Sequence, residues 1–199
     1  AYNNLGNVYQ EQAKFEEARD AYTKAIEINP EYASAYNNLG NVYLEQAKFK
    51  DAKNAYKKAI EINPEYIEAN YNLGSLFREQ KKPYKAIEAY NKALSINPDY
   101  VPALNNLGIL LKDIGKLEEA IEIYKKVIKI KPDYAYAYNN LGNIFRKQNR
   151  IQDAIEVYDV ALTKNPDYTE AYANLGKALI LATDIKPSST IISRILSLL

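Results

Sequence analysis

A single period governs this sequence. Proline recurs every 34 residues, at Pro30, Pro64, Pro98, Pro132 and Pro166. A Leu-Gly pair recurs with the same spacing, beginning at Leu5, Leu39, Leu73, Leu107, Leu141 and Leu175. A strict period of this length indicates tandem supersecondary units that cannot bury their own apolar faces and must stack on their neighbours. The chain is therefore expected to form one elongated array whose core runs along its whole length.

The composition narrows the chemistry that such an array can perform. The chain has no His and no Cys, so the commonest general base, the usual activated nucleophiles and the favoured transition-metal ligands are all missing. Adjacent carboxylates such as Glu16 and Glu17 fall where the first turn of a helix favours acidic residues. We therefore expect no enzymatic activity, no cofactor and no metal.

The charge balance also limits the expected partners. Lys plus Arg number 26 and Asp plus Glu number 25, which gives a net charge of +1. A nearly neutral chain offers no continuous basic track for nucleic acid or an anionic membrane. Apolar stretches are too short to span a bilayer, and no signal-peptide pattern opens the sequence. Location is not fixed by these features, and a cytoplasmic or other intracellular protein is the expectation.

One repeat shows why each unit should be a pair of helices. Tyr36, Leu39, Gly40, Tyr43 and Ala47 follow at spacings of three and four and form one packing face of a first helix, called helix A. A second apolar stripe, of Ala52, Ala55, Tyr56 and Ala59, forms the inner face of helix B. Glycine is costly in the middle of a helix, so its recurrence indicates close approach by a neighbouring helix.

Each recurring proline is expected to mark the boundary between two repeats. Because a residue before proline is disfavoured in the helical region, Asn63 should end helix B. Pro64 is then expected to open the next helix A, with Glu65 behind it. Pro83 lies in a turn between helices A and B and should start its own helix B.

These residues resemble the tetratricopeptide repeat over nearly the whole chain. The family pattern of an aromatic, Leu-Gly, an aromatic, Ala, an aromatic, Ala and Pro is matched in the second repeat by Tyr36, Leu39, Gly40, Tyr43, Ala52, Tyr56, Ala59 and Pro64. Asn70 and Leu104 depart from it by replacing the first aromatic. The resemblance implies an all-α, right-handed α-solenoid, a superhelix of stacked antiparallel helix pairs that serves protein–protein interaction.

The repeats divide a single array that covers residues 1–199. The expected units are 1–32, which is truncated at its N-terminus, 33–66, 67–100, 101–134, 135–168 and a degenerate sixth repeat at 169–199. The last segment, Ser188 to Leu199, has one broad apolar face and is expected to cap the array, or else to contact a partner or a second copy. Because Ala1 begins inside a repeat and Met is absent, the chain is expected to be a fragment or an engineered protein.

An asparagine precedes every Leu-Gly pair, on the side of helix A opposite its packing face. These six residues, the asparagine ladder, are Asn4, Asn38, Asn72, Asn106, Asn140 and Asn174. An asparagine side chain has one acceptor and two donors, so it can pair with the C=O and the N–H of an extended peptide of any sequence. In the resembled family, helices A line a concave groove. The ladder resembles the asparagine-lined superhelix of O-linked N-acetylglucosamine transferase, whose catalytic domain is absent here.

Other polar residues on the same face are candidates for peptide contact. They are Asn7, Asn41 and Asn143, one turn after the ladder, and Arg78, Lys112 and Arg146 near the helix ends. Glu11, Glu45 and Glu79 adjoin them in the earlier repeats. We expect a groove that is acidic toward the N-terminus and basic toward the C-terminus, and a protein or peptide ligand of complementary polarity.

Three alternatives stay open at this stage. In the first, the asparagines serve the fold alone; in the second, the chain is the substrate-targeting domain of a larger enzyme such as a glycosyltransferase; in the third, it is a designed or reconstructed scaffold with no native ligand. A further expectation is end-to-end self-association, through Tyr2, Leu5 and Tyr9 of the first helix and the apolar Leu198-Leu199 at the other end.

Overall fold

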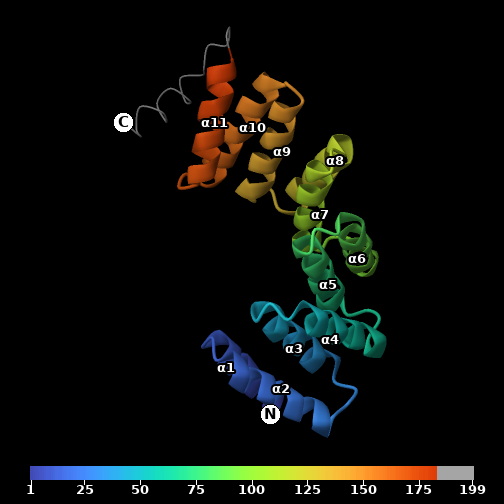
Figure 1. Cartoon of the computed structure of the whole chain (residues 1–199). Helices are drawn as coiled ribbons and strands as arrows, with labels where there is room; N and C mark the ends of the chain where they lie inside the picture. Colours follow the sequence, from blue (N-terminus) through green and yellow to red (C-terminus); the bar gives the residue numbers. More distant parts are fainter. Residues whose placement is uncertain (183–199) are drawn as a thin grey trace. The chain divides into compact units, whose positions relative to one another are not determined.

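The computed structural model describes residues 1–182, and these fold into eleven α-helices with no strand (Figure 1). The helices are α1 (Tyr2–Glu11), α2 (Phe15–Ile28), α3 (Ala33–Glu45), α4 (Phe49–Ile62), α5 (Ile67–Glu79), α6 (Pro83–Ile96), α7 (Val101–Asp113), α8 (Leu117–Ile130), α9 (Ala135–Lys147), α10 (Ile151–Lys164) and α11 (Thr169–Leu181). Odd-numbered helices are the predicted helices A and even-numbered ones the helices B. The all-α solenoid of helix pairs is confirmed.

Contacts divide the chain into two compact units, Ala1–Asn106 and a second unit that begins at Leu107. In the first unit each helix from α1 to α6 packs against the next, and α1 touches α3 as α3 touches α5. In the second unit α9 packs between α8 and α10, and α11 packs on α10 and α9. Successive helices A therefore lie next to one another within each unit.

A tyrosine on each helix B forms the centre of each repeat. Tyr22, Tyr56, Tyr90, Tyr124 and Tyr158 are all fully buried. The glycine of helix A makes room for this ring, because a Cβ built on Gly40 would lie 2.5 Å from Tyr56 Cε1. The glycines of repeats 1, 3, 4 and 5 face the equivalent tyrosines as closely. The predicted close approach at the recurring glycine is confirmed.

Helices A end in one recurrent turn. After α3 the Lys48 N–H donates to the Tyr43 carbonyl and the Ala47 N–H to the Leu44 carbonyl, both at 2.8 Å. This is the Schellman arrangement, which requires a left-handed residue after the helix. That residue is Ala47, with φ 55°, and the same turn places Ala13, Lys81, Gly115 and Asn149 at positive φ. The prediction that Ala47 packs on the face of helix A is wrong, because it lies exposed in this turn.

Helices B end as predicted, but the following helix begins later than expected. Asn63 is extended, with φ −132° and ψ 94°. Its side-chain oxygen accepts the Glu65 N–H at 3.1 Å, and its carbonyl accepts the Tyr66 N–H at 3.0 Å. Pro64 lies inside this turn and α5 starts only at Ile67, so the prediction that Pro64 opens the helix is wrong. Pro83 does start α6.

Two predictions fall wholly or partly beyond this part of the chain. The capping segment Ser188 to Leu199 lies outside the described residues, as do Leu198 and Leu199 of the predicted self-association. At the other end, Tyr2 and Leu5 are 40% and 41% exposed. Among residues 1–182, no helix combines the length and the apolar character that crossing a bilayer requires.

Candidate functional site

The asparagine ladder is less exposed than the predicted solvent-facing row. Asn4 is exposed, and Asn38, Asn72 and Asn140 are half-buried. Asn106 and Asn174 are buried, with only 8% and 7% of their surface exposed. Buried polar groups must find hydrogen-bond partners, so the contacts of these amides decide what each one still offers to a ligand.

In the first unit the ladder asparagines bind the preceding helix A through their amide nitrogens. Asn38 Nδ2 donates to Asn3 Oδ1 at 3.2 Å and to Asn7 Oδ1 at 3.0 Å. One repeat later, Asn72 Nδ2 donates to Asn37 Oδ1 at 2.9 Å and to Asn41 Oδ1 at 3.1 Å. Both donors of these two ladder residues are therefore used between repeats, and Asn38 Oδ1 also accepts from Asn37 Nδ2 at 3.3 Å.

The asparagines one turn further along have the opposite arrangement. Asn7 Oδ1 accepts the Tyr22 hydroxyl at 2.9 Å in addition to the Asn38 amide. Asn41 Oδ1 likewise accepts the Tyr56 hydroxyl at 2.8 Å in addition to the Asn72 amide. Both lone pairs of Asn41 Oδ1 are occupied, and Asn7 Oδ1 shares the single Tyr22 proton with Gln10 Oε1, which is also at 2.9 Å, so Asn7 and Asn41 present their NH₂ groups. These NH₂ groups have no partner among residues 1–182.

In the third repeat, other side chains make the hydrogen bonds at the equivalent positions. Asn106 Nδ2 donates to the Tyr71 hydroxyl at 3.1 Å. Arg78 Nη1 donates to Asn106 Oδ1 at 3.0 Å. Ser75, which stands where Asn41 stands in the second repeat, lies 3.3 Å from the Tyr90 hydroxyl. The predicted site residues Arg78 and Asn106 are thus brought together, in a contact that uses the acceptor of the asparagine.

The second unit repeats part of this pattern. Asn174 Nδ2 donates to Asn139 Oδ1 at 3.0 Å, and the Tyr158 hydroxyl donates to Asn143 Oδ1 at 2.8 Å. The fourth repeat lacks the pair, because Ile109 stands where Asn143 stands in the fifth. The Tyr124 hydroxyl is accordingly buried without a hydrogen-bond partner in the described part of the chain.

Burial has a common effect on these tyrosines. It raises the pKa of Tyr22 to about 12, with a smaller contribution from Glu11. Burial also raises the pKa of Tyr56 and, in the second unit, that of Tyr124. Each phenol is therefore a neutral donor at physiological pH, which is the form that the asparagine oxygens require.

Charged residues predicted to contact a peptide line two hollows, one in each unit. In the first unit a hollow of about 380 Å³ is lined by Asn7, Gln10, Glu11 and Asn38. In the second unit a hollow of about 440 Å³ is lined by Lys112, Asn143, Arg146, Lys147 and Asn174. Among residues 1–182, Lys112 has a distant ion pair with Asp113 at 3.6 Å, and the Nε of Arg146 is buried without a hydrogen-bond partner. The second hollow is therefore positive.

Sequence reasoning missed the partners that hold the site. It identified Asn7, Asn41 and Asn143 as surface residues but did not connect them with Tyr22, Tyr56 and Tyr158 on helices B. It also passed over Asn3, Asn37 and Asn139, which accept the ladder amides. The doublets Asn3-Asn4, Asn37-Asn38 and Asn139-Asn140 were the available signal, because adjacent helical positions face different neighbours.

Family models cover nearly all of the described chain. Three described as "Tetratricopeptide repeat" match residues 1–65, 38–101 and 89–122, and one described as "TPR repeat" matches residues 110–145 and 142–180. None of the curated proteins matches the sequence.

Solved structures share the fold. The crystal structure of YrrB, described as a TPR protein with an unusual peptide-binding site, is 28% identical, covers 86% of this chain and 89% of its own, and has a TM-score of 0.71. A crystal structure of MamA is 28% identical, with coverage of 81% and 95% and a TM-score of 0.74. PilF of Pseudomonas aeruginosa, at 22% identity, covers 99% of this chain and 88% of its own with a TM-score of 0.82, a likeness of fold alone.

Proposed function

The chain belongs to the tetratricopeptide repeat family, a family of interaction scaffolds, and from that premise we propose that the helix-A surface of each of its units binds extended peptide segments without catalysing a reaction. The ligand is a protein partner rather than a small substrate, because the residues that face this surface are amides and charged side chains. The absence of His and Cys supports a role in binding rather than in chemistry.

The observation that carries this proposal is the complementary use of two asparagines per repeat in the first unit. Asn38 and Asn72 commit their donors to the protein and keep acceptor capacity for a ligand, although Asn38 Oδ1 also accepts from Asn37. Asn7 and Asn41 commit their acceptors and present donors. An extended peptide offers N–H and C=O groups that match such a surface whatever its sequence. The inter-repeat hydrogen bonds fix both sets of groups before a ligand arrives, which lowers the entropic cost of binding.

The charges add a preference to this backbone recognition. We propose that the positive hollow of Lys112, Arg146 and Lys147 holds an acidic part of a ligand on the second unit. Exposed Glu11 and Glu45 on the first unit favour a basic part there. Ligands with acidic stretches are then expected to bind the second unit more weakly as salt rises, because exposed charges are screened within about 8 Å at physiological ionic strength.

Hydrogen bonds alone give little affinity. Each contributes roughly 0.5–1.5 kcal/mol net, whereas association costs roughly 4–15 kcal/mol. A few asparagine contacts therefore need the charged groups, or several repeats at once, to hold a peptide. Weak, sequence-tolerant binding is the expected behaviour of the first unit by itself.

The test removes the NH₂ groups that Asn7 and Asn41 present to a ligand and keeps the side-chain oxygens that accept from the tyrosines. In the double variant Asn7→Asp, Asn41→Asp, the carboxylates still accept from Tyr22 and Tyr56 but offer no N–H to a peptide. Binding of a fluorescent, sequence-diverse peptide library should weaken by at least about fivefold while the helical circular dichroism is kept.

The matched control makes the same two amide-to-acid changes elsewhere. Asn54 and Asn91 are exposed on α4 and α6, so Asn54→Asp, Asn91→Asp should bind the library as the parent chain does. Equal binding by the parent and the Asn7, Asn41 variant would mean that the asparagines serve the fold alone.

A further inference from the structure

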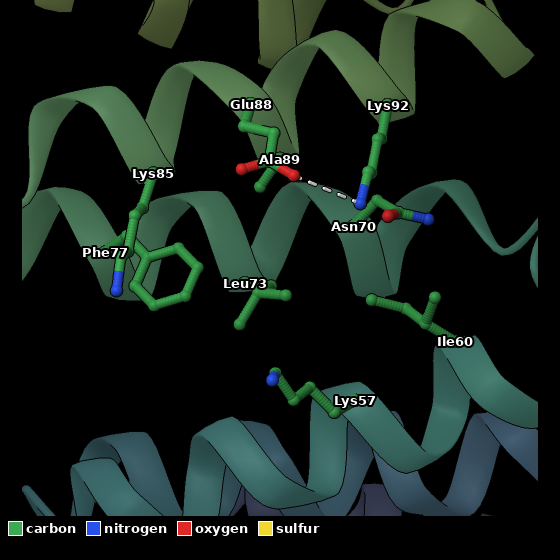
Figure 2. A pocket seen from close by; sticks show the side chains of 9 residues that line it. All are labelled: Lys57, Ile60, Asn70, Leu73, Phe77, Lys85, Glu88, Ala89 and Lys92. Carbon is green, nitrogen blue, oxygen red and sulfur yellow. Dashed lines mark ion pairs between the residues drawn. The ribbon is translucent and has the colours of Figure 1, made fainter.

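A second hollow lies in the first unit, on residues that the asparagine surface does not use. It has a volume of about 320 Å³ and is enclosed by α4, α5 and α6 (Figure 2). Its inner wall is apolar, with Leu73 and Phe77 from α5, Ile60 from α4 and Ala89 from α6. Leu73 and Ala89 belong to one core cluster, against which Ile60 and Phe77 pack, so this wall is a fixed part of the fold.

A departure from the repeat pattern distinguishes the wall of this hollow. Asn70 stands at the position that holds Tyr36 in the second repeat and Tyr138 in the fifth. It is 2% exposed, and its Nδ2 donates to the Tyr66 carbonyl of its own helix start at 3.1 Å. The asparagine thus turns to its own backbone, and this part of the wall has no aromatic ring.

The hollow at the equivalent place in the second repeat, where the ring is present, can be compared with this one by its lining residues. The equivalent hollow there, of about 350 Å³, has Tyr36 in its wall and is lined by residues of α3 and α4 only. In the third repeat the hollow also reaches Lys57 and Ile60 on the preceding helix B. The hollow beside Asn70 thus lies between three helices and the hollow beside Tyr36 between two, with similar volumes.

Lysines surround the opening of this hollow. Lys57 on α4 extends toward Leu73, and Lys85 and Lys92 approach from α6 (Figure 2). Lys92 pairs with Glu88 at 3.3 Å. Lys57 and Lys85 have no ion-pair partner among residues 1–182. The rim therefore carries an excess of two positive charges over an apolar wall.

We propose that this hollow, referred to as the Asn70 pocket, binds a segment of a partner protein that inserts one aromatic side chain and flanks it with carboxylates. The ring takes the place that Tyr36 occupies in the second repeat and contacts Ile60, Leu73 and Phe77. Carboxylates on either side of the ring pair with Lys57 and Lys85. An apolar anchor in a fixed pocket with a charged rim is the usual composition of an interface hot spot.

The chain itself provides a clean assay. It contains no Trp, so the emission of a peptide tryptophan reports the peptide alone. The probe is an amidated, acetylated peptide with one Trp between two pairs of Asp. We expect saturable binding with a blue shift of the emission, and at least about tenfold weaker binding when the Trp is replaced by Gly.

Variants locate the probe in the Asn70 pocket. Asn70→Tyr restores the ring of the other repeats and should weaken binding by at least about tenfold, while Asn70→Ala leaves the space open and should bind as the parent chain does. Lys57→Glu, Lys85→Glu should weaken binding by at least about tenfold. The matched control, Lys129→Glu on the exposed face of α8, should change little.

The outcomes separate this site from the asparagine surface. Unchanged affinity in the Asn7→Asp, Asn41→Asp variant is expected, and loss of binding there would overturn the assignment to the Asn70 pocket. So would equal affinity of Asn70→Tyr and the parent chain, or no saturable binding below about 1 mM peptide. If Asn70→Tyr does not fold, two other results still test the Asn70 pocket: the comparison of the Trp and Gly peptides, and the binding of the lysine variants.

Discussion

At the scale of single residues, the fourth repeat provides a natural comparison for the tyrosine–asparagine bond. Tyr56 donates to Asn41 at 2.8 Å, whereas the hydroxyl of the equally buried Tyr124 has no hydrogen-bond partner among residues 1–182, and Ile109 stands at the position of Asn41. A hydrogen bond made in the folded state contributes about 1 kcal/mol, while a buried hydroxyl without a partner costs free energy. The two hydroxyls should therefore have opposite effects on stability.

Tyr56→Phe should lower the free energy of unfolding by about 1 kcal/mol, because it removes the hydroxyl from Asn41 and leaves the ring in place. Tyr124→Phe should leave stability unchanged or raise it slightly. Urea unfolding followed by circular dichroism measures both variants against the parent chain. Equal destabilisation by the two substitutions would show that the Tyr124 hydroxyl has a partner in solution.

The sequence predicted the positions of these residues but not the hydrogen bond between them. Periodicity alone placed Tyr56 in the core and Asn41 on the exposed side of its helix, and both placements hold. It did not predict that the two are joined, because the bond depends on how helix A packs on helix B, fifteen residues further along the chain. The departure from the pattern at Asn70 was visible in the sequence, but only the structure shows that Asn70 lines a hollow together with residues of α4 and α6.

At the scale of elements, the turn after helix A imposes a conformation that few residues favour. Ala13, Ala47, Lys81, Gly115 and Asn149 all have positive φ. A side chain with a Cβ is strained in the left-handed region by roughly 1–2 kcal/mol, and glycine is not. Among the five, glycine stands only in the fourth repeat, so the turns of the first three repeats carry strain.

Ala47→Gly should raise the free energy of unfolding by about 0.5 kcal/mol, because relief of strain exceeds the added freedom of the unfolded chain. Gly115→Ala should lower it by about 1 kcal/mol. The cost is purely one of backbone conformation, since a Cβ at Gly115 meets no atom within 4 Å of the described structure. Urea midpoints of the two variants test both signs.

The control for these variants is the same substitution inside a helix. Ala173 is exposed in the middle of α11, so Ala173→Gly should destabilise by about 1 kcal/mol. Destabilisation by Ala47→Gly as well would contradict the account of the turn.

The ends of the helices were the weakest part of the sequence prediction. Ala47 continues the spacing of Tyr36, Leu39 and Tyr43, and alanine favours helices, so nothing in the pattern marks it as a turn residue. Pro64 is compatible with the start of a helix, and its true place is decided by the Asn63 side chain, which caps the turn instead. Local hydrogen bonds of this kind are invisible to periodicity.

At the scale of the whole molecule, the five fully buried tyrosines of helices B make stability sensitive to alkaline pH. Burial is the main cause of the raised pKa of each of them, and Tyr22 reaches about 12. An unfolded tyrosine loses its proton near pH 10. Between pH 10 and about 12 the unfolded state therefore binds fewer protons than the folded one, and stability falls as pH rises.

The free energy of unfolding should be constant from pH 7 to 9 and should then fall by about 1.4 kcal/mol per pH unit for each buried tyrosine. Urea unfolding at pH 8, 10 and 11 measures the loss, and absorbance at 295 nm follows tyrosinate. Ionisation of the buried phenols should coincide with loss of the helical signal. Five additional tyrosinates in a chain that stays helical at pH 11 would contradict this prediction.

The asparagine bonds of the first unit also bear on how such a chain lengthens. Each repeat carries acceptors for the repeat after it and donors for the repeat before it, as Asn3 and Asn7 accept from Asn38, and Asn37 and Asn41 from Asn72. A duplicated copy inserted between two repeats would meet matching groups on both sides. Gene duplication could thus add such a unit without leaving an asparagine amide without a hydrogen-bond partner. Ser75 and Ile109 are places where the copies differ from this pattern.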